Sequence, residues 1–185
     1  MPKSYIIGLG TGRCGTLSLS NLFNTQENTL VTHEVPLNMP WEFNSTRIDN
    51  KLVEWGKQQF LYVGDVASYY LPYVSYINSK VEDVKFVCLK RDKTETSNSW
   101  ISKLTDVLSK NNFREQDGTF RTGPFYSCFP KYETSSLFEA TGMYWEEYYG
   151  RARVLEEKMD NFRIFNLKDL NTLSGVEQIL TFAGF

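Results

Sequence analysis

Residues 8–16 carry the side chains and glycines that can bind a phosphate group. They read Gly-Leu-Gly-Thr-Gly-Arg-Cys-Gly-Thr and follow the short apolar run 5–7. Glycines allow a tight turn whose backbone N–H groups approach an anion, and the positive end of a following helix dipole points the same way. Arg13 and Thr16 add a guanidinium and a hydroxyl. The segment therefore predicts a phosphate-binding loop between a strand and a helix.

Two common phosphate loops do not fit these residues. A loop that cleaves ATP or GTP carries Lys and then Ser or Thr after its second glycine, whereas Gly15 is followed by Thr16 and Leu17. A tyrosine-phosphatase loop needs an Arg six residues after its cysteine, and Ser20 stands at that distance from Cys14. The sequence excludes both classes of site.

A dinucleotide-binding loop remains an alternative. Gly10, Gly12 and Gly15 match its glycine spacing, and Glu34 lies near the position of the acid that binds the ribose. An NAD-type oxidoreductase is therefore the second hypothesis. It leaves Arg13 without a role.

A further motif lies at the end of the apolar run 84–89, where Arg91 is followed eight residues later by Ser99. Together with residues 13–16, this motif resembles the sulfotransferases that use 3′-phosphoadenosine-5′-phosphosulfate (PAPS). The resemblance implies a P-loop-like α/β fold and transfer of a sulfuryl group from PAPS to a hydroxyl or amine. It also implies that 3′-phosphoadenosine-5′-phosphate (PAP) is the product and that no metal is needed.

The resemblance assigns roles to individual residues. Arg91 and Ser99 would hold the 3′-phosphate, and Arg13 would be the cation beside the leaving phosphate. The expected contacts to the 5′-phosphosulfate are Gly12, Arg13, Cys14, Gly15, Thr16 and Leu17.

Two positions depart from the family pattern. Leu17 replaces a second hydroxyl that many members carry. Cytosolic members also cover the 3′-phosphate with a C-terminal Arg-Lys-Gly loop, and we expect none here because the sequence ends at Phe185. Arg121 is the candidate substitute.

The general base is not identified by a local motif. His33 is the only histidine, and its ordinary pKa near 6.5 suits proton transfer at neutral pH. Glu34 and Asp65 are competing candidates at predicted strand ends. Cys14 is interpreted as a small residue that fits the loop, although the helix N-terminus and Arg13 would lower its thiol pKa. If no base is competent, the chain is a catalytically silent nucleotide-binding protein, which is the third hypothesis.

Short apolar runs alternate with stretches of helical periodicity along the chain. The predicted strands are 5–7, 30–32, 60–63, 84–89 and 162–165. This order predicts one α/β domain over residues 1–185, with a mostly parallel sheet of about five strands and helices on both faces. Ligands bind such sheets at the carboxyl ends of the strands.

Helix starts are predicted from capping residues. Asp92 with Glu95 and Ser136 with Glu139 match capping boxes, and so does Ser174 with the glutamate three residues later. A helix is also expected to open at proline 72 of the chain.

Residues 111–133 interrupt the pattern with prolines, glycines and aromatic side chains. A connection of this length usually covers a site or is disordered, and its aromatic content favours a cover. On the long helix that follows, Tyr144 and Tyr148 either pack against the sheet or line an acceptor pocket, and packing is the simpler interpretation.

Composition restricts the partners. The chain has 185 residues, a formal charge of −2 and three cysteines without metal-ligand spacing. No apolar stretch approaches the length of a membrane span. We therefore expect a soluble cytoplasmic protein that binds neither nucleic acid nor membrane, with a small-molecule or carbohydrate acceptor. Its oligomeric state is left open.

Overall fold

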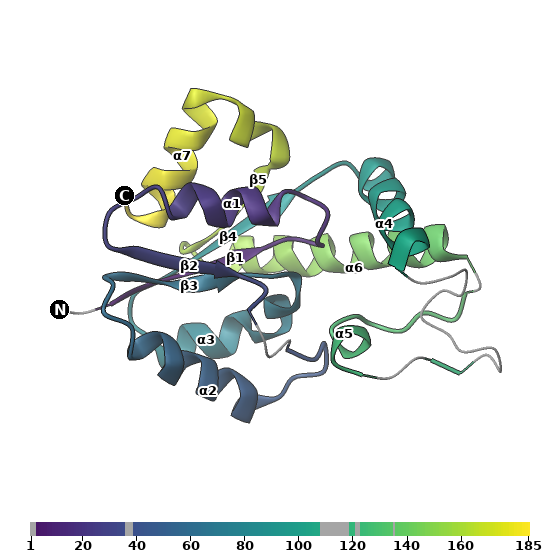
Figure 1. Cartoon of the computed structure of the whole chain (residues 1–185), viewed down its shortest axis with the longest axis horizontal. Coiled ribbons are helices and arrows are strands. Elements are labelled where there is room, and N and C mark those ends of the chain that lie inside the picture. The colour runs from purple at the N-terminus through teal and green to yellow at the C-terminus, as the bar shows by residue number, and fades with distance from the viewer. Residues whose placement is uncertain (1–2, 36–38, 108–118, 121–122, 135) are drawn as a thin grey trace.

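A computed structural model describes residues 3–35, 39–107, 119–120, 123–134 and 136–185 (Figure 1). Five strands form its centre: β1 (Ser4–Leu9), β2 (Thr29–His33), β3 (Tyr62–Val66), β4 (Val84–Lys90) and β5 (Phe162–Asn166). Their order across the sheet is β2-β3-β1-β4-β5, and every neighbouring pair is parallel. The predicted α/β fold is confirmed.

Helices cover both faces of the sheet, as a parallel sheet with apolar strands requires. α1 (Thr16–Phe23) and α7 (Leu173–Ala183) pack on one face, above the sheet in Figure 1. α2 (Ser45–Gly56), α3 (Val74–Lys80), α6 (Leu137–Lys158) and the 3₁₀ turn η1 (Ser68–Tyr73) pack on the other. The two cores are separate, so each strand sends alternate side chains into each of them.

The remaining elements connect or flank these layers. α4 (Lys93–Val107) follows β4 and packs against α6, while the 3₁₀ turn η2 (Leu167–Asn171) leads from β5 to α7. The one-turn helix α5 (Pro124–Ser127) belongs to the predicted aromatic cover. Of that cover, Phe113 and Arg121 lie outside the described residues. No helix in the described part of the chain has the length and apolar character needed to cross a bilayer.

Two predicted helix starts are found at the expected residues. The Ser136 hydroxyl accepts a hydrogen bond from the Glu139 backbone at the start of α6. At the start of α4, the Asp92 carboxylate accepts from the Glu95 backbone N–H at 3.0 Å. The Glu95 carboxylate pairs with the Arg91 guanidinium instead of closing a capping box. Half of that box therefore forms, because a charged partner competes for the second half.

Two other helix starts differ from the prediction. Thr172, not Ser174, caps α7, and its hydroxyl accepts from the Gly175 N–H at 3.1 Å. Pro72 lies inside η1, and α3 begins only at Val74. β3 also runs further than predicted, so Asp65 is part of the strand and not of the loop after it. Each boundary differs from its predicted position by only a few residues. The longer β3 matters most, because it fixes the face of the sheet to which the Asp65 side chain points.

Candidate active site

The loop between β1 and α1 has a backbone that only glycine adopts easily. Gly12 and Gly15 have φ angles of 73° and 91°, and a Cβ on Gly15 would lie 2.4 Å from the Leu167 side chain. Arg13 between them also has a positive φ of 56°. A left-handed backbone at a non-glycine residue costs roughly 1–2 kcal/mol, so surrounding contacts must hold it.

Buried aromatic side chains supply those contacts. The Tyr148 hydroxyl accepts from the Gly10 N–H at 2.9 Å and donates to the Ser68 carbonyl at 3.0 Å. The Trp100 indole N–H donates to the Thr11 carbonyl at 3.2 Å. α6 and α4 therefore fix the loop from beneath.

Two more tyrosines of α6 lie beside Tyr148. Tyr149 donates to the Leu89 carbonyl at 2.7 Å, while Tyr144 packs edge-on against Phe129 and Tyr148. All three tyrosine rings are buried and pack in the core, and Tyr144 also lines a small apolar pocket beside Trp100 and Phe129. The hydrogen bonds of the Tyr148 and Tyr149 hydroxyls were missed from sequence. The available signal was tyrosine, not phenylalanine, at buried helix positions, because a buried hydroxyl needs a partner.

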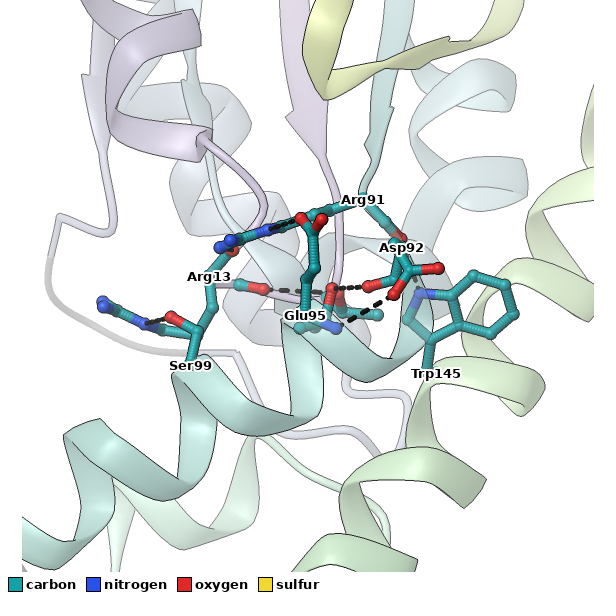
Figure 2. Close-up of polar contacts among 9 residues, drawn as sticks. Arg13, Arg91, Asp92, Glu95, Ser99 and Trp145 are labelled. Atoms are coloured by element: carbon teal, nitrogen blue, oxygen red, sulfur yellow. Dashed lines mark hydrogen bonds and ion pairs between the residues drawn. The ribbon is translucent and has the colours of Figure 1, made fainter.

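The two sequence motifs meet on the other side of the loop (Figure 2). The Arg13 Nε donates to the Ser99 Oγ at 3.1 Å, and Arg91 Nη1 donates to the Arg13 carbonyl at 3.1 Å. Arg91 Nε pairs with the Glu95 carboxylate at 3.0 Å. The Trp145 indole donates to the Arg91 carbonyl and fixes the end of β4. Arg91 thus has both an acidic neighbour and a structural role in the loop.

A cavity of about 390 Å³ opens beside these residues, within the range of small-molecule sites. It brings together both predicted phosphate motifs and the end of β2. Its lining consists of Gly12, Arg13, Gly15, Thr16, Leu17, His33, Glu34, Arg91, Ser99, Trp100, Lys103 and Phe125.

The charge of the cavity suits a multiply charged anion. Arg13, Arg91 and Lys103 line it, and Glu34 is the only carboxylate among the lining residues. Within the described residues no acidic side chain pairs with Lys103. Sequence reasoning missed Lys103. The available signal was its position four residues after Ser99, which places both on one helix face.

His33 and Glu34 enter the cavity from the end of β2. His33 Nε2 lies 3.0 Å from the Thr16 Oγ1, so the only histidine contacts the phosphate loop. Glu34 has a left-handed φ of 51°. Burial raises the pKa of its carboxyl, and nearby Asp65 adds to the rise while His33 and Arg13 oppose it. In the part of the chain that the structure describes, no group donates a hydrogen bond to this carboxylate.

Asp65 lies elsewhere. Its side chain is completely buried and does not line the cavity. It points to the α2 side of the sheet, where Tyr70 donates to Oδ2 at 2.9 Å and Thr32 to Oδ1 at 2.8 Å. Burial raises the pKa of Asp65, and these two hydrogen bonds oppose the rise. The third base candidate therefore has no access to a ligand in the cavity.

The Cys14 side chain differs from expectation, whereas Leu17 lines the cavity as expected. The Cys14 thiol is completely buried, and its pKa is raised to about 11 by burial instead of being lowered by the helix N-terminus. Only the Cys14 backbone can therefore meet a ligand. The Leu17 side chain is 56% exposed and lines the cavity together with exposed Phe125 of α5. These two exposed side chains add apolar surface to the cavity.

No protein-family model matches the sequence, and no curated protein sequence matches it either. Solved structures do match. A sulfotransferase from Alicyclobacillus acidocaldarius aligns with a TM-score of 0.62 and 15% identity, over 100% of this chain and 82% of its own. Mouse sulfotransferase SULT7A1, solved with PAP, aligns with a TM-score of 0.60 and 13% identity, over 100% of this chain and 60% of its own.

A third structure is the sulfotransferase domain from the curacin biosynthetic pathway. It aligns with a TM-score of 0.56 and 11% identity, over 98% of this chain and 72% of that domain. Three sulfotransferases therefore share the order and layering of the whole chain at low sequence identity. The chain has the sulfotransferase fold.

Proposed function

We propose that the chain is a sulfotransferase that moves the sulfuryl group of PAPS to a hydroxyl or amine of a small-molecule or carbohydrate acceptor. One observation carries the proposal: a single cavity contains the glycine loop, Arg13, Arg91 and Ser99. The sulfotransferase fold supports it, and one neighbour was solved with PAP. An NAD-type oxidoreductase leaves both arginines without a role.

The donor would lie along the positive side of the cavity. We assign its 5′-phosphosulfate to the loop, through the side chains of Arg13 and Thr16 and the backbone of residues 12–17. Arg91, Ser99 and Lys103 would hold the 3′-phosphate. Glu95 already compensates part of the charge on Arg91. Lys103, which has no acidic partner among the described residues, supplies attraction that a doubly charged phosphate needs.

The chain's own residues then have distinct chemical roles. Once bound, PAPS supplies a sulfuryl group attached to a phosphate leaving group. The Glu34 carboxylate takes the proton of the acceptor hydroxyl or amine. Arg13 and the N–H groups at the start of α1 stabilise negative charge that collects at the loop, and His33 orients the Thr16 hydroxyl. Positioning and electrostatics dominate such group transfer.

Glu34 is preferred to the other two base candidates for a geometric reason. Its carboxylate lines the cavity, whereas Asp65 is buried on the far face and His33 already contacts Thr16. A raised pKa brings a carboxylate closer to the operating pH and makes it a stronger base. Because the base must be ionised, activity should rise with pH through the raised Glu34 pKa. Glu34→Gln should abolish this rise, and His33→Gln should retain it.

Residues 123–133 are proposed to cover the cavity, through Phe125. The single-domain organisation over residues 1–185, the absence of a metal and the location in the cytoplasm also stay proposals. None of them enters the chemical argument for sulfuryl transfer.

Thermal unfolding with PAP, AMP, NAD and ATP in parallel tests the donor site. A ligand at a hundred times its Kd stabilises the folded state by about 2.7 kcal/mol, which shifts Tm by several degrees in a domain of this size. Stabilisation by PAP but not AMP is expected. Stabilisation by NAD alone would contradict the donor assignment and favour the oxidoreductase.

A transfer assay then separates an enzyme from a silent binding protein. The wild-type chain is incubated with PAPS and a panel of hydroxylated and aminated small molecules and sugars, and release of PAP is measured. Acceptor-dependent release is expected and should be lost in Glu34→Gln. PAP binding without release for any acceptor would favour the catalytically silent alternative.

A further inference from the structure

A buried carboxylate lies behind the end of β2. Asp65 is 0% exposed, and its two oxygens accept from Thr32 and Tyr70. The nearby backbone N–H of Val35 lowers the pKa of Asp65. Thr32 precedes His33, so this carboxylate contacts the residue just before the dipeptide that faces the cavity.

A buried lysine contacts the same segment from α2. Lys51 is 5% exposed, and its ammonium donates to the Val35 carbonyl at 3.1 Å. The positive charge of Lys51 also lowers the pKa of Asp65. Lys51 therefore holds Val35, the residue just after Glu34, while Asp65 holds Thr32, the residue just before His33.

We propose that Asp65 and Lys51 are positioning residues that hold the turn at His33 and Glu34 against the phosphate loop. The proposal rests on the function proposed above, because it gives these residues a role in that cavity. It also changes the role of Asp65 from a candidate base to a support for the base.

Backbone geometry explains why such a support is needed. Glu34 has a left-handed φ of 51°, which persists only where neighbouring contacts hold it. The register pairs His33 with Val66, and the Glu34 N–H donates to the Val66 carbonyl at 3.2 Å, so β3 guides the turn from one side only. Asp65 and Lys51 hold it from the α2 side.

The network also has an electrostatic effect. The charged groups that act on the Glu34 carboxyl are His33 on β2, Asp65 on β3 and Arg13 on the loop. Asp65 raises the Glu34 pKa, whereas the other two lower it. Asp65→Asn should therefore move the acidic limb of the activity profile to lower pH. A residue with only a general structural role would leave that limb in place.

His33 provides a test that does not depend on activity. Because it is the only histidine, its imidazole C–H signals in a ¹H–¹³C NMR spectrum need no assignment. The spectrum is recorded across a pH titration for wild type, Asp65→Asn, Lys51→Met and the milder Thr32→Val. Asp49→Asn is the matched control. Asp49 also lies in α2 and its carboxylate also accepts from a tyrosine, Tyr76 of α3, but this hydrogen bond is exposed.

We expect the imidazole signals to shift and broaden in the three network variants, because the imidazole ring is no longer held at hydrogen-bond distance from the Thr16 hydroxyl. They should be unchanged in the control. Imidazole spectra and titration curves of folded Asp65→Asn and Thr32→Val that superimpose on wild type would overturn the proposal. If Asp65→Asn does not fold, Thr32→Val alone decides. This result stands whether or not the protein transfers sulfuryl groups.

Turnover supplies the second readout. With an acceptor found in the transfer assay, Asp65→Asn should lower kcat by about tenfold to a hundredfold while KM for PAPS stays within about twofold, because Arg13, Arg91 and Lys103 keep their places in the cavity. Equal changes in kcat and KM would contradict a positioning role. Unchanged imidazole signals refute the positioning role, whereas inactive wild-type protein refutes only the enzyme assignment.

Discussion

The two sides of the cavity are held in different ways. The phosphate loop rests on neutral groups in the core, such as the completely buried Tyr148 hydroxyl. The opposite rim is formed by Arg91, Glu95, Ser99 and Lys103. It depends on exposed charges: in the Arg91–Glu95 ion pair, the side chains are 29% and 57% exposed. The loop is fixed before any ligand arrives, while the rim is built from contacts that a ligand can replace.

This difference follows from solvent exposure. A buried neutral hydrogen bond is costly to break because its partners remain unsatisfied away from water. An exposed ion pair contributes only about 0–1 kcal/mol and weakens further as salt screens it. The loop should therefore contribute stability and orientation, and the rim should contribute salt-dependent affinity.

Arg13 belongs to both sides and should give the largest effect. Its backbone lies in the loop and its side chain reaches Ser99 on the rim. Arg13→Ala should lower kcat by about 10²–10³-fold, the usual loss for one group that stabilises developing charge. Arg13→Lys keeps the charge and should lose less. Initial rates at saturating PAPS measure both, and an unchanged kcat with weaker binding alone would contradict the assignment.

Tyr148→Phe tests the loop side. It should lower the free energy of unfolding by about 1–3 kcal/mol, because the Gly10 N–H and the Ser68 carbonyl lose their buried partner. Tyr76→Phe removes a hydroxyl that contacts exposed Asp49 and should cost less than about 1 kcal/mol. Urea denaturation compares the two variants. Equal losses of unfolding free energy in the two variants would show that burial does not make the Tyr148 hydrogen bonds stronger than the exposed Tyr76 bond.

Arg91→Ala and Lys103→Met test the rim. Arg91→Ala should reduce the preference for PAP over AMP by about tenfold, and Lys103→Met by about threefold to tenfold, since both cations face the proposed 3′-phosphate. Lys57→Met, an exposed lysine outside the cavity lining, is the control and should change neither affinity.

Calorimetric titrations at two salt concentrations measure these preferences. The effects of both rim variants should shrink at high salt, because screening weakens exposed charges. A preference for PAP that survives both substitutions would place the 3′-phosphate elsewhere.

Glu95→Gln should give the smallest effect. Removing the exposed carboxylate frees Arg91 and should raise PAP affinity by about twofold to threefold, with unfolding free energy changed by less than about 1 kcal/mol. The same titrations and urea curves measure both quantities. A loss of PAP affinity would mean that Glu95 mainly orients the Arg91 side chain and does not mainly compete with PAP for it.

Much of this arrangement was predictable from short-range signals. Glycine spacing at residues 10–15 predicts the loop because few other residues accept its backbone angles. Alternating apolar runs predict the parallel sheet, and its strand ends bring Arg13, His33, Glu34 and Arg91 to one edge. These features depend on local backbone geometry and on general rules of chain connection.

The role of Asp65 was not predictable in the same way. The sequence places it just after a strand, whereas β3 runs to Val66 and includes it. Successive strand residues face opposite sides of a sheet, so its place within the strand decides between cavity and core. Strand boundaries depend on tertiary pairing, which local patterns do not specify.

The sequence by itself determined the fold class, the phosphate loop and the candidate residues, because backbone preferences and hydrophobic periodicity act over short distances. Only the tertiary structure decided that Arg13 joins Ser99, that Arg91 is shared with Glu95, and that Asp65 lies behind the site. The Arg13–Ser99 contact joins residues far apart in the chain, and so does the bond from Arg91 to the Arg13 carbonyl, whereas Arg91 and Glu95 are only four residues apart. They depend on how helices and strands pack, and each side chain's partner is set by that packing.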